Sequence, residues 1–193
     1  MTKIGFGITG SFCTFDKTLI GLKELVDNGY DVYPVVTYNT FNISTRFGNN
    51  EEFIKKVEDI TGKKVVNKIE GAETFGAQNK MDAFVVFPAT GNFIGKIANA
   101  ITDNPVLMAC KSTLRNNKPI LIGISSNDSL GMNGINIMKL LNTKNFFFIP
   151  FSQDDYVNKP NSLISHFDLL IESLEKALVK EQLQPVLREK KWK

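Results

Sequence analysis

The residues nearest the N-terminus that could do chemistry are glycines. Gly5, Gly7 and Gly10 match the spacing GxGxxG, which binds the pyrophosphate of a dinucleotide when it follows a strand and opens a helix. Here Gly5 and Gly7 fall inside the expected strand at residues 3–8. The second expected strand ends at Thr37, where an NAD site would need an acidic residue for the ribose. We therefore do not predict a dinucleotide site from this motif.

Polar turns after the expected strands are better candidates for a site. An open parallel sheet binds its ligands beyond the carboxyl ends of its strands, which here means residues 9–13, 37–48, 88–92 and 125–133. In the first turn, free amides and hydroxyls at a helix start can hold a phosphate, although a purely structural turn would have the same composition. The residues that we predict for this phosphate turn are Thr9, Gly10 and Ser11.

The elements that must position these turns alternate between strand and helix. This pattern predicts an α/β fold, a doubly wound, mostly parallel sheet with helices on both faces. The expected strands are residues 3–8, 30–37, 64–68, 82–87, 119–124 and 145–151. The expected helices cover Leu19 to Val26, the segment between Asn50 and Gly62, residues 93–100, 105–114 and 132–141, and a long stretch after Pro160.

Three details of these elements can be predicted from single residues. Pro34 has no backbone N–H, so the second strand is expected at an edge or a bulge. Thr102 or Asp103 is expected to cap the helix at residues 105–114. The last helix is expected to carry one apolar stripe from Leu163 to Leu178.

Composition limits the class of protein. The 193 residues are 42% apolar and 22% charged, with a net charge of +3, which fits one domain over residues 1–193 and gives no basic stripe for a nucleic acid. No apolar run is long enough for a membrane span. Cys13 and Cys110 have neither zinc-site nor disulfide spacing, so we predict no metal site and a reducing, cytoplasmic location.

One segment carries a family resemblance. Residues 88–92, Pro-Ala-Thr-Gly-Asn, followed by Lys96 to Asp103, resemble the loop that meets the flavin in the flavoprotein family of cysteine decarboxylases and flavin prenyltransferases. The resemblance implies a Rossmann-like three-layer sandwich that binds FMN and forms homo-oligomers. The cofactor-binding residues that it implies are Thr9, Gly10, Ser11, Thr37, Pro88, Ala89, Thr90, Asn92, Met132 and Asn133.

Further segments narrow the resemblance. Residues 45–48, 103–109, 127–134, 148–155 and 159–162 are similar, in order and over nearly the whole chain, to the family of dipicolinate synthase B subunits. That family implies a partner, the A subunit of dipicolinate synthase, which resembles an NAD- or NADP-dependent dehydrogenase, and a small dicarboxylate substrate from the lysine pathway. It also implies the cytoplasm of a sporulating cell, where the two proteins make dipicolinate.

A dicarboxylate substrate implies fixed cationic or donor groups. Arg46 is the first candidate because a guanidinium holds a carboxylate bidentately, with a solvated surface arginine as the alternative. Asp128 is the candidate for a base or an orienting group, and a structural turn residue is equally open.

Other functions of the same fold stay open. A free-standing FMN decarboxylase would use a histidine, and the chain has His166 alone. A prenyltransferase would need an arginine cluster around prenyl phosphate, which three scattered arginines do not offer. A non-catalytic assembly protein is the third alternative.

Overall fold

The computed structural model describes residues 1–78 and 80–189. In this part of the chain, one sheet of seven strands has the order β2-β1-β3-β4-β7-β6, and β5 pairs with β4. Neighbouring strands from β2 to β5 are parallel, while β7 runs antiparallel to β4 and β6. The strands are β1 (Lys3–Ile8), β2 (Asp31–Val36), β3 (Ala83–Ala89), β4 (Ile120–Ser126), β5 (Phe146–Phe148), β6 (Phe151–Asp155) and β7 (Lys159–Ser165).

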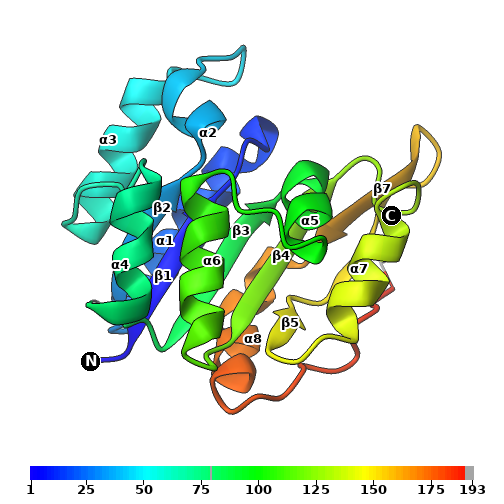
Figure 1. The fold of residues 1–193 in the computed structure, drawn as a ribbon. Coiled ribbons are helices and arrows are strands. Elements are labelled where there is room, and N and C mark those ends of the chain that lie inside the picture. The colour runs from blue at the N-terminus through cyan, green and yellow to red at the C-terminus, as the bar shows by residue number, and fades with distance from the viewer. Residues whose placement is uncertain (79, 190–193) are drawn as a thin grey trace.

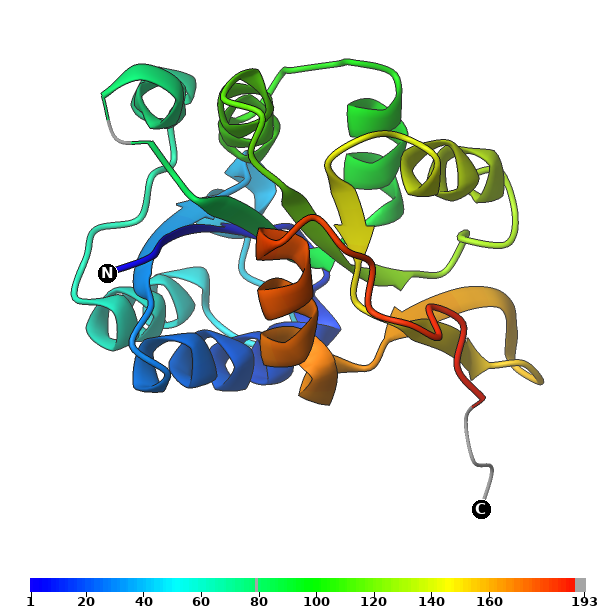
Figure 2. The ribbon, with the colours of Figure 1, turned by 90° about the horizontal axis from the view of Figure 1, so that it is seen from below.

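Helices cover both faces of this sheet, as Figure 2 shows when the sheet is seen edge-on. One layer holds α1, α3 and α8, and the other holds α4, α5, α6 and α7 (Figures 1 and 2). The predicted three-layer α/β fold is therefore confirmed. The helices are α1 (Phe15–Asp27), α2 (Tyr38–Asn42), α3 (Asn50–Thr61), α4 (Ile69–Ala77), α5 (Gly91–Ala98), α6 (Pro105–Arg115), α7 (Gly134–Leu141) and α8 (Leu170–Leu178), with 3-10 turns η1 (Phe12–Thr14) and η2 (Phe167–Leu169).

The central strand β3 explains why the two layers have separate cores. All seven of its residues are buried, as expected for a parallel strand covered on both faces. Phe84 and Val86 belong to the core under α4, α5, α6 and α7, whereas Val85 and Phe87 belong to the core under α1, α3 and α8. Alternate side chains of one apolar run thus anchor both helical layers.

The glycines of the GxGxxG match serve this packing. Gly5 lies opposite Phe84 in the parallel pair of β1 and β3, and a Cβ on Gly5 would overlap the Phe84 ring. Gly7 is similarly confined, since its Cβ would lie 2.7 Å from Val106. The missing side chains let a phenylalanine ring lie over β1, which agrees with placing these glycines inside a strand.

Strand β2 lies at the end of the sheet order, so the edge position predicted from Pro34 is confirmed. Beyond it, Val66 makes one parallel bridge to Val35, and its backbone N–H donates to the Pro34 carbonyl at 2.9 Å. The strand expected at residues 64–68 is therefore reduced to a single bridge. The following helix α4 and the short helix α2 were not predicted.

The C-terminal third departs most from the sequence prediction. The long helix expected after Pro160 is wrong: β7 occupies residues 159–165, and the helix α8 begins only at Leu170. Leu163 and Leu170 belong to different cores, so the expected stripe does not exist as one face. The helical spacing is overridden because Leu163 and Ile164 pair with Ser126 and Ser125 of β4.

Two smaller boundaries also differ. The strand expected at residues 145–151 is two strands, because β5 pairs with β4 whereas Phe151 begins β6 and pairs with β7. The N-cap of α6 is Asn104, whose side chain accepts a hydrogen bond from the Leu107 N–H at 3.1 Å, rather than Thr102 or Asp103. Within the described residues, no helix is long and apolar enough to cross a bilayer.

Candidate functional site

Two adjoining cavities lie at the carboxyl ends of β1, β3 and β4. These strand ends are at the top of the sheet in Figure 1. Each cavity has a volume of about 310 Å³, and both are lined by Gly10 and Thr90. The first cavity is further lined by Thr9, Thr37, Tyr38, Asn39, Asn92, Phe93, Lys96, Asp103 and Asn104. The second is further lined by Ser11, Phe12, Cys13, Thr14, Phe47, Gly91, Ser125, Ser126, Asn127, Asp154, Lys159, Ser162, Leu163 and Ile164.

The first cavity is built on a hydroxyl that ties two turns together. The Thr9 hydroxyl, 1% exposed, donates to the Pro88 carbonyl at 2.7 Å and accepts from the Thr90 N–H at 3.0 Å. These bonds join the turn after β1 to the turn after β3. They therefore fix the relative position of two turns that line the cavities. Pro88 and Ala89 themselves are buried in β3, and neither is among the residues that line the cavities.

Two helix starts border the first cavity. Thr37 caps α2 by accepting from the Thr40 N–H, and Thr90 caps α5 by accepting from the Phe93 N–H, both at 3.4 Å. Asn92 follows within the first turn of α5. The amides of a helix start favour an anion, so these positions fit a phosphate or a carboxylate.

The charged residues of the first cavity form one pair at its rim. Lys96 Nζ lies 2.5 Å from Asp103 Oδ2, and the two residues come from α5 and from the connection to α6. The rest of the lining consists of hydroxyl, amide, aromatic and backbone groups. This composition suits a ligand that is held by many directed hydrogen bonds.

The second cavity lies between the η1 turn and the β6–β7 hairpin. The Ser11 and Ser125 hydroxyl oxygens are 2.8 Å apart, so the turns after β1 and β4 meet there. In the hairpin, Lys159 Nζ lies 3.2 Å from Asp154 Oδ2. The Ser162 hydroxyl donates to Asn127 Oδ1 at 3.4 Å and joins the hairpin to the β4 turn.

Asp128 belongs to a hydrogen-bonded cluster beside these cavities. Its carboxylate accepts from the Ser126 hydroxyl and, at 2.6 Å, from Asn133 Nδ2. A Cβ on Gly91 would overlap Asp128 Oδ1, so the carboxylate packs directly on the first residue of α5. These bonds hold the Asn133 amide in one orientation.

The remaining candidates lie farther from the cavities. Arg46 is on the loop between α2 and α3, with its guanidinium carbon 4.9 Å from the centroid of the Phe47 ring. Phe47 lines the second cavity, but Arg46 is not among the lining residues. Met132 is 87% exposed, and Asn133 is buried in the Asp128 cluster. The structure thus groups Thr9, Gly10, Ser11, Thr37, Thr90 and Asn92 and leaves Arg46, Pro88, Ala89 and Met132 outside the lining.

Sequence reasoning assigned no role to several lining residues. Lys96, Lys159 and Ser162 fall in the segments that carry the family resemblance, which is the signal that could have found them. Asp103 was expected only as a helix cap, and the segment after Pro160 was expected to be helical. The position of Ser162 at the second cavity depends on the β6–β7 hairpin.

Three comparisons with known proteins agree with the fold. The family model described as Flavoprotein matches residues 1–163. The B subunit of dipicolinate synthase from Bacillus subtilis (strain 168) is 52% identical over 97% of this chain and 94% of its own length. The crystal structure of the dipicolinate synthase B subunit from Bacillus halodurans has a TM-score of 0.91 at 49% identity, covering 98% of this chain and 97% of that one.

More distant proteins share the fold. The FMN-dependent cysteine decarboxylase SpaF has a TM-score of 0.68 at 17% identity, covering 93% of this chain and 96% of that one. A bifunctional coenzyme A biosynthesis protein, CoaBC of Methanocaldococcus jannaschii, is 30% identical over 62% of this chain and 28% of its own length. At 17% identity, the SpaF structure supports the fold of the sheet and its helices.

Proposed function

We propose that this chain, which belongs to the flavoprotein family, is the B subunit of a dipicolinate synthase. It would act with the A subunit of that enzyme to oxidise a dihydrodipicolinate-type intermediate to dipicolinate, pyridine-2,6-dicarboxylate, in the cytoplasm of a sporulating cell. The observation that carries the proposal is the 52% identity over nearly the full length of a dipicolinate synthase B subunit. The two adjoining polar cavities support it, because they offer neighbouring places for a cofactor and a small substrate.

The first cavity fits flavin mononucleotide. Gly10 has no side chain at the floor, Thr37 and Thr90 mark two helix starts, and Lys96 supplies a cation at the rim. These are the groups that a phosphate and a ribityl chain need. When bound, FMN accepts the hydride that side chains cannot accept.

The chain's own residues bind and orient the two ligands. Thr9 keeps the turns after β1 and β3 at a fixed separation, and Asp128 fixes the amide of Asn133. Ser11 and Ser125 present hydroxyls to the second cavity, where they would donate to the substrate. Arg46 lies next to Phe47, which lines the second cavity. We keep Arg46 as a proposed cation for a substrate carboxylate.

The partner protein and the oligomer are part of the same proposal. The relative is named as one subunit of a synthase, and the distant decarboxylases share this fold. We propose that the A subunit carries NAD or NADP and that copies of this chain form a homo-oligomer. The flavin cavity of this chain would then supply one hydride acceptor, and the A subunit would supply a second.

The first experiment is the visible absorbance spectrum of the purified chain, before and after FMN is added and the buffer exchanged. We expect retained flavin absorbance, and dipicolinate formation when the A subunit, NADP and a freshly made dihydrodipicolinate-type substrate are added. Flavin retention without dipicolinate formation would favour another flavoenzyme of this fold. Dipicolinate formation without flavin retention would move the hydride acceptor to the partner protein. Formation that survives replacement of the lining hydroxyls would give this chain an assembly role.

A further inference from the structure

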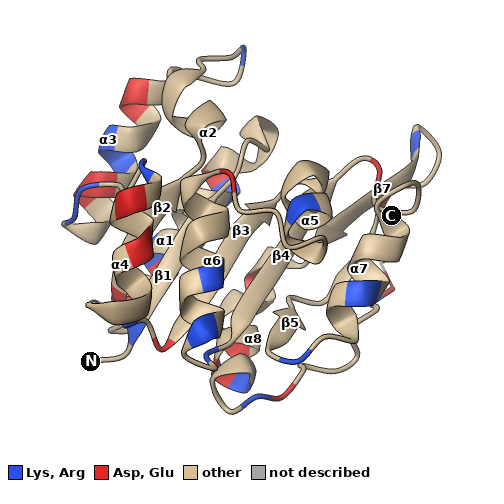
Figure 3. Cartoon of the chain, in the orientation of Figure 1, with Lys and Arg blue, Asp and Glu red and all other residues tan. Residues whose placement is uncertain are grey.

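The charged residues that line the second cavity are the pair Asp154 and Lys159. They come from the two strands of the β6–β7 hairpin, Asp154 from β6 and Lys159 from the first position of β7. Figure 3 shows the hairpin end of β7 in blue, beyond the tan strands of the sheet. Lys159 is therefore the cation that this cavity offers within the described part of the chain.

The hairpin holds Lys159 in a defined place. At the turn, the Asp155 carboxylate accepts from the N–H groups of Val157 and Asn158 at 3.2 and 3.0 Å. At the other end, β7 pairs with the last residues of β4. Because both ends are tied, the lysine side chain starts from a fixed backbone position in the lining of the cavity.

The contact between Lys159 and Asp154 is one that a ligand can replace. Their side chains are 52% and 27% exposed, and the single N–O distance of 3.2 Å is long for an ion pair. Exposed pairs of this kind contribute little to stability. A ligand carboxylate that enters the cavity can take the place of the Asp154 oxygen, since the ammonium has three donors.

The turns after β1 and β4 offer donors of a different kind to this cavity. Ser11 and Ser125 meet there, and Ser126 and Asn127 follow on the same turn. A ring with two carboxylates can therefore place one on an ammonium and the other on hydroxyl and amide groups. A ring with one carboxylate can use one of these two sets of donors.

We infer that Lys159 binds one carboxylate of the dicarboxylate substrate and that Asp154 holds its ammonium until the substrate enters. The inference rests on the proposed function and adds the residue that selects a dianion over a monoanion. Asp154 then competes with the ligand for Lys159, so removal of its charge strengthens binding.

The test is calorimetric binding of two probes, dipicolinate and pyridine-2-carboxylate, to the purified full chain. The wild type should prefer dipicolinate, and Lys159→Gln should bind it about ten- to a hundredfold more weakly, the usual loss for a hydrogen bond to a charged group. Its preference over pyridine-2-carboxylate should disappear. Lys159→Arg should keep part of the affinity, and Asp154→Asn should tighten dipicolinate binding several-fold.

The control is Lys55→Gln on α3, which also removes an exposed lysine that pairs with an aspartate. It should bind both probes as the wild type does. Equal affinity of Lys159→Gln and the wild type for dipicolinate would overturn the inference, and so would weaker binding by Asp154→Asn.

Dipicolinate formation with the A subunit separates this inference from the proposed function. If the wild-type mixture makes dipicolinate and Lys159→Gln leaves its KM unchanged, the inference fails while the function stands. If the wild type binds dipicolinate through Lys159 but the mixture makes none, the function fails and the carboxylate site stands.

Discussion

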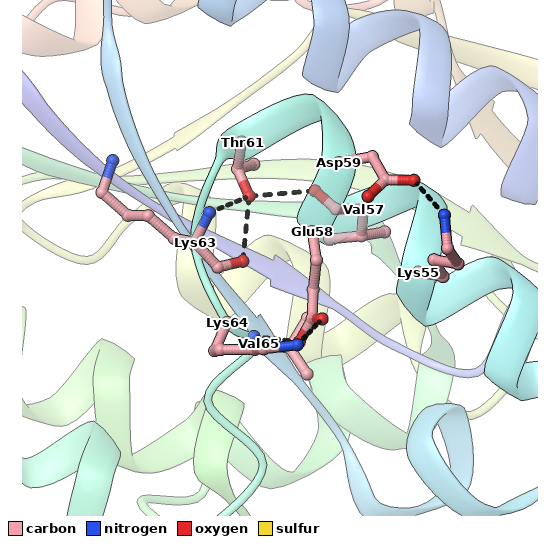
Figure 4. A network of polar contacts seen from close by, with 8 residues as sticks. All are labelled: Lys55, Val57, Glu58, Asp59, Thr61, Lys63, Lys64 and Val65. Carbon is pink, nitrogen blue, oxygen red and sulfur yellow. Dashed lines mark hydrogen bonds and ion pairs between the residues drawn. The ribbon is translucent and has the colours of Figure 1, made fainter.

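Lysine–acid pairs in two parts of the molecule have different surroundings. At the end of α3, shown in Figure 4, Glu58 accepts from Lys64 Nζ at 2.7 Å and from the Val65 N–H at 3.1 Å. The Thr61 hydroxyl donates to the Val57 carbonyl nearby. Here the acid holds side chain and backbone together, so the pair shapes the chain between α3 and the edge of the sheet.

Along the cavities the pairs face open volume. Lys96–Asp103 and Lys159–Asp154 each join two elements, and all four residues line a cavity. The presence of an ion pair therefore does not by itself indicate a structural or a functional role. An acid that also accepts from the backbone, as Glu58 does from the Val65 N–H, helps to hold the fold, and a pair beside a cavity can exchange one partner for a ligand.

The largest effect should come from Gly91→Ala, which tests the region along the cavities. The added Cβ would overlap Asp128 Oδ1 and lie 2.8 Å from Asn133 Nδ2, so these side chains must move and the hydrogen bond between them is disturbed. We expect a cost of about 1–3 kcal/mol and flavin binding at least about tenfold weaker, measured by fluorescence titration with FMN.

The matched control is Gly131→Ala in the same turn, where the new Cβ would meet its nearest neighbour at an ordinary 3.4 Å. It should bind flavin as the wild type does. Unchanged flavin affinity in Gly91→Ala would show that the Asp128 cluster does not shape the cofactor cavity.

The next largest effect should come from Thr9→Val. This change keeps the shape but removes the buried hydroxyl that joins the Pro88 carbonyl and the Thr90 N–H. Unpaired buried groups cost about 1–3 kcal/mol, so we expect lower stability in urea unfolding together with weaker flavin retention. Thr9→Ser should restore most of both. Loss of stability with full flavin retention would limit Thr9 to a structural role.

The smallest effect should come from Glu58→Gln on the α3 side. Partial burial raises the pKa of Glu58, but hydrogen bonds from Lys64 and the Val65 N–H outweigh it and lower the pKa below its usual value. A lowered folded-state pKa gives stability that is present above the unfolded pKa of about 4.3 and is lost as the pH falls through the folded value. We expect Glu58→Gln to lose about 1 kcal/mol at pH 7.

The pH dependence is the check on this prediction. Urea unfolding of Glu58→Gln and wild type should differ at pH 7 and converge as the pH falls below about 4. Flavin retention should stay as in the wild type, because Glu58 lies outside both cavities. A loss of flavin from Glu58→Gln would show that the ion pair at the end of α3 also supports the cavities, which contradicts the difference between these two regions.

Much of the fold follows from local pattern. The strand at residues 3–8 and the helix from Pro105 are found where periodicity and turn residues put them, because parallel strands and amphipathic helices carry strong local signals. Several site residues also follow, since the turns after parallel strands meet at one edge. Thr9 was predicted for this reason, whereas Thr37, Thr90 and Asn92 were implied by the family resemblance. All four line the first cavity.

The sequence by itself determined the alternation of strands and helices, the edge position of Pro34 and the family. The tertiary structure decided the β6–β7 hairpin, and with it the place of Lys159 and Asp154 at the second cavity. The reason is that Leu163 pairs with Ser126, 37 residues earlier, a contact that β4 supplies and local spacing does not record. The apolar spacing from Leu163 to Leu174 is compatible with a helix, but strand pairing with β4 favours an extended chain at Leu163.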